Sequence, residues 1–337
     1  MSPAGQDGAA PAGHPPGPPG SPGPATPAVT TPLTPAIALT QARAAGLDRQ
    51  EAQWLLEALS GWSRARLISQ DDQALPAEAA ARWPDWLRRR LAGEPLAYLR
   101  GGREFHGLWL EVDARVLDPR PDTETLVDWA IELLPGLLAQ HHEDEPLRLA
   151  DLGTGSGAIA LALAHWLATS RPTAARARPA EVIAIDRSLD ALAVARANGE
   201  RLGLPVHWLA GHWWQALAGG PARALDLAVS NPPYIRPDDP HLPALRHEPH
   251  QALVAGEAGL ADLRALIEGA PKWLLPGGWL LLEHGHDQAG PVADLFRQAT
   301  DGAGNSLWEA ISHRADLAGN QRCTGARRVA AGGTGPG

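Results

Sequence analysis

The chain of 337 residues contains a single cysteine, Cys323. An intrachain disulfide and a zinc site built from several cysteines are therefore excluded, and a reducing, cytoplasmic location is expected. The sequence also lacks an uninterrupted apolar run of the roughly 18 residues that a membrane span needs. Its first residues lack the basic start and apolar block of a signal peptide. We therefore expect a soluble protein that does not bind membranes.

An excess of positive charge is lacking as well, since the formal net charge is −9. Proteins that hold nucleic acid by neutralising phosphates usually carry a basic face, so we expect no stable nucleic-acid binding and favour a protein partner. One basic stretch, Arg82 to Arg103, departs from this balance. Contact with ribosomal RNA or an acidic protein is one interpretation, but a solvated helix surface explains the stretch better. Nothing in the sequence demands more than a monomer.

Two groups of histidines invite a metal interpretation: His141-His142, which precede acidic residues, and His284 with His286. A polar loop and the end of a strand account for them better. We therefore expect no metal.

Composition and periodicity divide the chain. Residues 1–35 hold 11 of the 32 prolines and one charged side chain, too little apolar surface to fold, and are predicted to form a disordered tail. Helical periodicity over 36–102 predicts a small helical bundle. Alternating apolar residues over 103–117 predict a linking β-hairpin. Residues 118–330 are predicted to form an α/β domain, followed by a flexible C-terminus at 331–337.

A glycine-rich turn, Gly153-Thr154-Gly155-Ser156-Gly157, joins a predicted buried strand at Leu147–Leu152 to a predicted helix at Ala158–Leu167. Such a turn lets a ligand approach backbone N–H groups at a helix N-terminus, so it predicts a nucleotide-like ligand. The same glycines also satisfy the looser dinucleotide pattern of a Rossmann fold. The turn alone does not choose the cofactor.

The next predicted strand, Glu181–Asp186, ends in an acid where α/β folds bind a ribose through its hydroxyls. Asp186 is therefore predicted to bind ribose oxygens, with an ordinary N-cap for the helix Ser188–Leu202 as the alternative. Asp151 has two interpretations as well: an acid that contacts the ligand, and an acid that orders the glycine-rich backbone without touching a ligand.

The tetrapeptide Asn231-Pro232-Pro233-Tyr234 follows the apolar run Leu225–Ser230. Prolines lack an N–H and fix the backbone, which leaves the carbonyls of the loop as unopposed acceptors. Asn231 adds a side-chain carbonyl and Tyr234 an aromatic face. Together they suit a planar group carrying an –NH2, such as a carboxamide or an adenine amine. The alternative is a turn that ends a strand.

The remaining segments indicate an α/β fold with a seven-stranded, mostly parallel sheet. In Pro119–Glu124, either Thr123 or Asp122 is expected to cap a helix, and the segment is also a candidate wall of the active site. The long loop 236–251 is expected to flank a peptide-binding cleft. The other predicted elements are a helix at Leu260–Leu274, a strand at Gly278–Glu283 and a hairpin at Trp308–Val329.

A combination of motifs resembles the protein-glutamine N(5)-methyltransferases that modify peptide chain release factors. The similarity runs from about Ala38 to Arg328. The Asn-Pro-Pro-Tyr loop is shared with adenine amino-methyltransferases, whereas the Pro-Arg-Pro-Asp-Thr-Glu segment and the Glu-His-Gly strand end are more specific to the family. The motifs are Asp151-Leu-Gly-Thr-Gly-Ser-Gly157, Asp186, Ser230–Ile235, Asp118–Leu126 and Leu281–Gly285.

The resemblance implies a class I S-adenosylmethionine-dependent methyltransferase with a Rossmann-like seven-stranded sheet. The cofactor would be bound by Gly153 to Gly157, by Asp186 and by Asn231, and Trp213 would pack beside the adenine. Core packing is the alternative for Trp213. Many members have an acid before this aromatic residue, where this chain has His212, so a cofactor contact at that position stays open.

The implied reaction is methylation of the side-chain amide of the glutamine in the Gly-Gly-Gln motif of release factors. Asn231 and the Pro232 carbonyl would accept the amide hydrogens, and Pro233 and Tyr234 would complete the substrate slot. The helical domain would recognise the release factor. Alternatives are glutamine methylation of a ribosomal protein, amino-methylation of adenine or RNA, and a non-catalytic module that binds S-adenosylmethionine.

Overall fold

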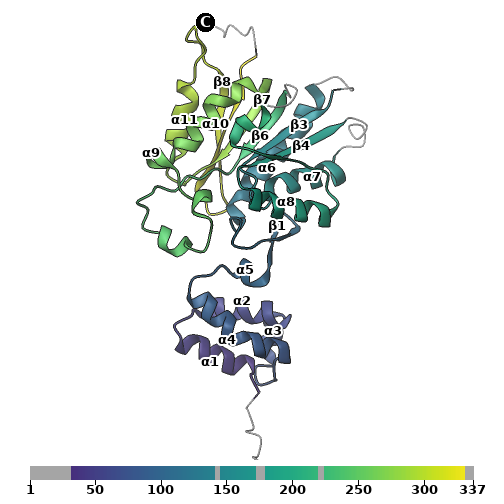
Figure 1. Ribbon diagram of the computed structural model, residues 1–337, viewed down its shortest axis with the longest axis vertical. Coiled ribbons are helices and arrows are strands. Elements are labelled where there is room, and N and C mark those ends of the chain that lie inside the picture. Colours follow the sequence, from purple (N-terminus) through teal and green to yellow (C-terminus); the bar gives the residue numbers. More distant parts are fainter. Residues whose placement is uncertain (1–31, 141–144, 172–178, 219–223, 331–337) are drawn as a thin grey trace, which may run out of the picture.

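The computed structural model describes residues 32–140, 145–171, 179–218 and 224–330 (Figure 1). A helical domain lies at one end of the molecule, and a sheet flanked by helices forms the rest. Most of the predicted tail, the last seven residues and the pair His141-His142 fall outside the described residues.

The helical domain has five helices, of which the first three start at side-chain caps and the last two start after prolines without such a cap. The oxygens of Thr34, Asp48 and Ser63 accept hydrogen bonds from backbone N–H groups of the first turns, which would otherwise lack partners. The domain thus begins at a cap on Thr34, slightly before the predicted boundary. The helices are α1 (Pro35–Ala44), α2 (Arg49–Ser60), α3 (Arg64–Ser69), α4 (Ala77–Leu91) and α5 (Leu96–Arg100).

The arginines between Arg82 and Arg103 are largely paired within the chain. Arg89 contacts Glu94 at 2.5 Å, Arg103 contacts Asp118 at 3.0 Å, and the Arg82 guanidinium lies 4.8 Å from the centre of the Trp86 ring. These arginines therefore make contacts within the chain, and the interpretation of the stretch as a solvated helix surface stays a prediction.

A two-stranded antiparallel sheet, β1 (Gly102–Phe105) and β2 (Leu108–Glu111), links the two domains. It is fastened by Asn198, a fully buried side chain. Asn198 Oδ1 accepts from the Glu111 N–H at 2.8 Å, and Nδ2 donates to the carbonyls of Glu111 at 3.0 Å and Ser156 at 3.1 Å. One side chain thereby ties the linking hairpin to the glycine-rich turn.

The main sheet has seven strands in the order β5-β4-β3-β6-β7-β9-β8. The first five pair in parallel, and β9 pairs antiparallel with both β7 and β8, so the sheet is mostly parallel, as the sequence predicts. The strands are β3 (Leu147–Leu152), β4 (Ala180–Asp186), β5 (His207–Ala210), β6 (Leu225–Ser230), β7 (Leu274–Glu283), β8 (Trp308–Ala315) and β9 (Gln321–Arg328).

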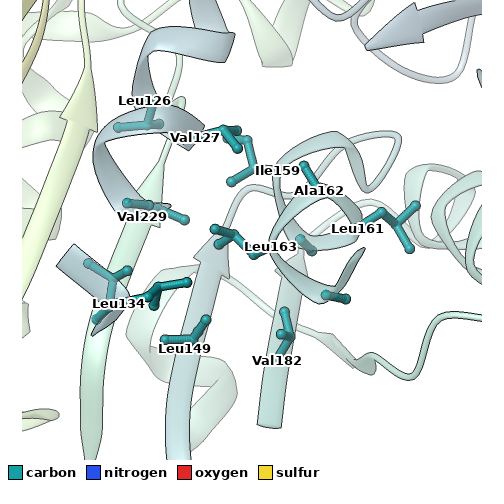
Figure 2. Close-up of a cluster of buried hydrophobic side chains, with 14 of the residues drawn as sticks. Leu126, Val127, Leu134, Leu149, Ile159, Leu161, Ala162, Leu163, Val182 and Val229 are labelled. Atoms are coloured by element: carbon teal, nitrogen blue, oxygen red, sulfur yellow. The ribbon is translucent and has the colours of Figure 1, made fainter. Parts of the chain in front are cut away.

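Helices cover both faces of this sheet, which explains why the central strands are apolar almost throughout. On one face, Leu126 of α6 (Glu124–Gln140) and Ile159 of α7 (Ala158–Thr169) pack towards Leu149 and Val229 (Figure 2). On the other face, α10 (Ala261–Gly269) and α11 (Ala289–Gln298) bury a second cluster. The helix α8 (Leu189–Leu202) and short elements complete the fold: α9 (Gly256–Gly259), η1 (Pro121–Thr123), η3 (Trp213–Leu217), η4 (Leu242–Leu245), η5 (His250–Ala252) and η6 (Ala270–Lys272).

The predicted helix Leu260–Leu274 is too long. The α-helix ends at Gly269, where a Cβ atom would lie 2.2 Å from Cδ1 of Trp214. Pro271 follows and cannot donate a hydrogen bond to continue the helix. Leu274 already belongs to β7, which therefore starts before the predicted Gly278.

The strand order reverses at β3, which has β4 on one side and β6 on the other. Ligands of open α/β sheets bind at such a point, outside the carboxyl ends of the strands. The segments that follow β3, β4 and β6 are the glycine-rich turn, the stretch after Asp186 and the Asn231 loop. Among the described helices, none is long and apolar enough to cross a membrane.

Replacing Asn198 by alanine is expected to lower the free energy of unfolding by about 2 kcal/mol or more, because backbone groups of Glu111 and Ser156 lose their partner and each unsatisfied buried group costs about 1–3 kcal/mol. Chemical denaturation measures this loss. The exposed Arg196 of the same helix provides the control, since Arg196→Ala should change stability by no more than about 0.5 kcal/mol. Equal effects of both substitutions would contradict the role given to Asn198.

Candidate active site

The glycine-rich turn leaves β3 in a backbone conformation that suits glycine. Gly153, Gly155 and Gly157 all have positive φ, between +55° and +85°, a region that other residues rarely enter. A Cβ on Gly153 would lie 3.0 Å from the Trp213 ring. The absence of a side chain at Gly153 thus allows an aromatic residue to close over the turn.

Asp186 joins this turn to the next helix. Its Oδ2 atom accepts from the Gly155 N–H at 2.9 Å, and Oδ1 accepts from the Ser188 N–H at 2.8 Å. The cap of α8 is Ser188, whose hydroxyl accepts from Ala191 N. Asp186 is therefore not the N-cap of α8. Each carboxylate oxygen keeps a lone pair for a further donor.

Asp151 is fully buried behind the turn. Its Oδ2 atom accepts from the Thr154 hydroxyl at 2.6 Å and from Ala160 N at 3.1 Å, whereas Oδ1 has no hydrogen-bond partner among the described residues. Burial raises the pKa of Asp151 to about 7, although the bonds from Thr154 and Ala160 oppose this rise. Asp151 thus orders the turn and retains one unsatisfied acceptor.

A cleft opens at the carboxyl ends of β3, β4 and β6, and we call it the cofactor cleft. Of the residues predicted to bind a cofactor, Gly153, Gly155, Asp186, Trp213 and Asn231 line it. Thr154 and Ser156 are buried behind it, and the position of a Cβ on Gly157 is crowded by Leu161 and Ala195. These three residues shape the turn.

Trp213 stands at the edge of the cofactor cleft and also packs against the second core cluster. Its indole N–H donates to Asp262 Oδ1 at 3.1 Å. The ring of His212 lies 5.3 Å from the Trp213 ring, centre to centre, and lines the same cleft. Trp213 therefore packs on the core and also lines the cleft, and its predicted contact with an adenine stays a prediction.

Sequence reasoning missed several residues that line this cleft. Asp262 starts α10, and Gln251 lies in η5, held by a hydrogen bond from Arg187 Nη2 to its carbonyl at 3.1 Å. No periodicity or motif marks them, because tertiary packing alone brings them to the cleft. The lining residues not predicted as site residues are Arg115, Val116, Leu117, Arg187, Ser188, Ala191, Gly211, Pro249, Gln251, Ala252 and Asp262.

The Asn231 loop is fixed on several sides. Pro232 is buried, and the Tyr234 hydroxyl donates to Glu283 Oε1 at 3.2 Å. The Tyr234 carbonyl accepts from Gln288 Nε2 at 3.1 Å. Asn231 Nδ2 donates to the hydroxyl oxygen of Thr123 at 3.1 Å. The side chain of Asn231 is thus held while it lines the cofactor cleft.

The prediction that Thr123 or Asp122 caps a helix is wrong, since η1 has no side-chain cap. Thr123 faces Asn231 instead, and Asp122 pairs with Arg322 at 3.0 Å. These contacts with distant residues draw both side chains away from the local N–H groups. The segment lies beside the Asn231 loop, and its role as a wall of the active site stays a prediction.

Glu283 is buried beneath this wall. Burial raises its pKa to about 7, which the hydrogen bond from Tyr234 and the charge of Arg322 oppose. Its Oε1 atom therefore anchors the Tyr234 end of the loop, and Oε2 has no hydrogen-bond partner among the described residues.

A second cleft of about 600 Å³ lies where α2 and α5 of the helical domain meet Arg120 and Leu245. Its rim is charged: Arg120 contacts Glu248 at 2.5 Å. The loop 236–251 contributes to both clefts, since Leu245 and Glu248 line the second and Pro249 the first. Among the described residues, no group of three or more His, Cys, Asp or Glu side chains could hold a metal ion.

Replacing Asp151 by asparagine should change how stability depends on pH. Because the folded-state pKa is raised from 3.8 to about 7, the folded protein binds the proton more tightly than the unfolded chain. The stability contributed is present below about pH 4 and is lost as pH rises to about 7.

Between about pH 4 and pH 7, the melting temperature of the unmodified protein should therefore fall relative to that of Asp151→Asn. At higher pH the difference between the two melting temperatures should stay constant. Glu283 titrates in the same window but is present in both proteins, so it cancels in the comparison. Parallel curves from pH 4 to 8 would show that Asp151 has no raised pKa.

Two family models match the chain: "PrmC N-terminal domain" over residues 34–101 and "Methyltransferase small domain" over residues 124–247. Among solved structures, a methyltransferase from Pyrococcus furiosus aligns with a TM-score of 0.41 at 18% identity, covering 67% of this chain and 90% of that chain.

Three curated relatives are each named release factor glutamine methyltransferase. The protein from Bordetella pertussis is 48% identical over 284 residues, which cover 83% of this chain and 95% of that protein. The protein from Burkholderia pseudomallei is 43% identical, covering 85% and 94%, and that from Coxiella burnetii is 41% identical, covering 83% and 92%. The chain therefore belongs to the family of release factor glutamine methyltransferases.

Proposed function

We propose that this protein transfers the methyl group of S-adenosyl-L-methionine to the side-chain amide nitrogen of the glutamine in the Gly-Gly-Gln motif of peptide chain release factors. The observation that carries the proposal is the fixed side chain of Asn231. Its Nδ2 atom is held by Thr123, so its carbonyl oxygen is free to accept a hydrogen bond in the cofactor cleft. A primary amide supplies such a donor.

The residues of the cofactor cleft fit S-adenosylmethionine. Asp186 has acceptor capacity left for ribose hydroxyls, and the Trp213 ring offers an apolar face for an adenine. The unpartnered Asp151 Oδ1 lies behind the glycine-rich turn and would complement the charge of an ammonium group. Bound S-adenosylmethionine would supply an electrophilic methyl group on a sulfonium sulfur.

An amide nitrogen is a poor nucleophile because its lone pair is delocalised into the carbonyl group. The chain's contribution is therefore to orient it. Asn231 Oδ1 and the Pro232 carbonyl would each accept one amide N–H and aim the nitrogen at the methyl group. Positioning of this kind lowers barriers by roughly 7–11 kcal/mol, and the acceptor dipoles stabilise the positive charge that develops on nitrogen.

In this reaction the nitrogen–carbon bond forms as the sulfur–carbon bond breaks, and the released proton leaves to water. No side chain is required as a base or as a nucleophile. Pro233 and Tyr234 complete the slot, and the anchoring of the Tyr234 hydroxyl on Glu283 holds its ring in one orientation.

Substrate choice would reside in the helical domain and the second cleft. The partly exposed Arg120, which is paired with the buried Glu248, and the exposed Trp54 of α2 offer polar and aromatic contacts to a protein. A methylated ribosomal protein, adenine or RNA base is the alternative substrate. The net charge of −9 disfavours the nucleic acids, and the relatives' names favour the release factor. We expect the protein to act as a cytoplasmic monomer.

The decisive substitution for this function is Asn231→Ala. Labelling of a purified release factor with radioactive methyl from S-adenosylmethionine should fall by at least about 10²-fold, the loss typical of removing one oriented dipole from a reaction site. Replacing the loop glutamine of the release factor should abolish labelling of that protein. Equal labelling of the glutamine-free release factor, or of RNA in its place, would reject the proposed substrate.

Asp186→Asn should weaken binding of S-adenosylhomocysteine about 10- to 100-fold, because hydrogen bonds to a charged group contribute about 1.5–3 kcal/mol. Calorimetric titration measures the affinity. Asp294→Asn, an exposed acid on α11, is the matched control and should bind as the unmodified protein does. Undiminished binding by Asp186→Asn would remove Asp186 from the cofactor site.

A further inference from the structure

Among the described residues, two carboxylates line the cofactor cleft, those of Asp186 and Asp262. They come from different elements, since Asp186 ends β4 and Asp262 belongs to the first turn of α10. The proposed function gives the ribose hydroxyls to Asp186 and gives Asp262 no part of the cofactor. The second acid therefore leaves open which polar group of a ligand it meets.

The indole ring of Trp213 lies between Asp262 and the glycine-rich turn. At its benzene edge, Cζ3 and Cη2 lie 3.0 and 3.2 Å from the position of a Cβ on Gly153. In its five-membered ring, Nε1 donates to Asp262 Oδ1 at 3.1 Å. The indole thus reaches from the turn to the carboxylate. A nucleoside whose sugar lies at the turn can extend its base along this ring towards Asp262.

Packing between η3 and α10 fixes the position of Asp262. Trp214 Nε1 donates to the Leu266 carbonyl at 3.0 Å, so two successive indoles of η3 hold α10 at points one helical turn apart. The backbone of Trp213 has a φ of 46°, which is rare for a bulky residue. Such conformations persist where surrounding contacts impose them, and they concentrate at ligand sites. The carboxylate is therefore held in place before a ligand binds, as selective recognition requires.

A carboxylate in this place selects hydrogen-bond donors. Each of its oxygens has two lone pairs, so Asp262 keeps acceptor sites beyond the one that Trp213 uses and offers no hydrogen of its own. Adenine carries an –NH2 donor on its six-membered ring, away from the sugar, where hypoxanthine carries an oxygen. His212 also lines the cleft, but an imidazole can present either a donor or an acceptor. Asp262 is therefore the group that distinguishes the two bases.

We propose that Asp262 determines the specificity for the base of the cofactor by accepting a hydrogen bond from the exocyclic amine of adenine. The inference rests on the proposed function, which supplies S-adenosylmethionine as the ligand. Asp186 binds the ribose and Asp262 the amine, with the Trp213 ring between them. The cleft thereby recognises both ends of adenosine and accepts nucleosides whose purine carries a 6-amino group.

The test compares binding of S-adenosylhomocysteine with binding of S-inosylhomocysteine, in which an oxygen replaces the exocyclic amine, by calorimetric titration of the full chain. The unmodified protein should bind the adenosyl compound at least about 100-fold more tightly, because the inosyl compound sets an oxygen against Asp262. Asp262→Asn keeps an acceptor for the Trp213 N–H and turns an –NH2 group to the cleft. It should bind the adenosyl compound about 10- to 100-fold more weakly and the inosyl compound at least as tightly as the unmodified protein does.

The ratio of the two affinities separates this role from a structural one, because both compounds meet the same folded fraction of a variant. His212→Ala and the exposed-site variant Asp294→Asn should keep the preference for the adenosyl compound.

The inference is overturned if the unmodified protein binds both compounds equally, or if Asp262→Asn keeps the full preference. A preference that His212→Ala loses and Asp262→Asn keeps would assign the contact to His212 instead. An unmodified protein that binds neither compound rejects the proposed function itself. One that keeps the preference but does not label a release factor supports the inference and rejects only the proposed substrate.

Discussion

The parallel pairing of β6 with its two neighbours is the constraint on which the site depends. Ser230 pairs with Leu282 of β7, so Asn231 and Glu283 both emerge at the same edge of the sheet. Because β3 pairs with the other side of β6, the glycine-rich turn emerges beside them. A shift of β6 by one residue would turn its side chains to the opposite faces and separate Asn231 from Thr123.

The site contains two buried acids, and burial disfavours the charged form of each. Asp151 and Glu283 are fully buried, and burial raises the pKa of each to about 7. Burying an acid carries a desolvation cost, so the presence of two buried acids at this site calls for a function. Asp151 orders the turn that would carry the cofactor, and Glu283 orders the loop that would carry the substrate amide.

Much of the fold could be predicted from the sequence because the central strands are short, mainly apolar runs that end at turn residues. The runs Leu147–Leu152 and Leu225–Ser230 are mainly apolar and are followed by the glycine-rich turn and by Asn231-Pro232-Pro233, and their limits are those of β3 and β6. The predicted end of the helix at Leu274 is wrong, although Pro271 is a local signal against it; the close contact between Gly269 and the distant Trp214 could not be predicted.

The candidate site divides in the same way. The glycine-rich turn, Asp186 and the Asn231 loop are contiguous motifs at strand ends, where α/β folds bind ligands. Asp262 and Gln251 reach the cofactor cleft only through tertiary packing. Thr123 was expected to satisfy its own helix, but a long-range contact with Asn231 replaces the local cap. A local pattern could not reveal that contact.

The orientation of the Asn231 amide is the central claim, and a neutron crystal structure of the protein with S-adenosylhomocysteine and a glutamine-containing peptide tests it most directly, because hydrogen positions distinguish the two ends of an amide. The account predicts that Asn231 Nδ2 remains on Thr123 and that Oδ1 accepts a hydrogen bond from the glutamine amide. An Asn231 –NH2 group turned towards the substrate, or a glutamine amide bound away from Asn231, would contradict it.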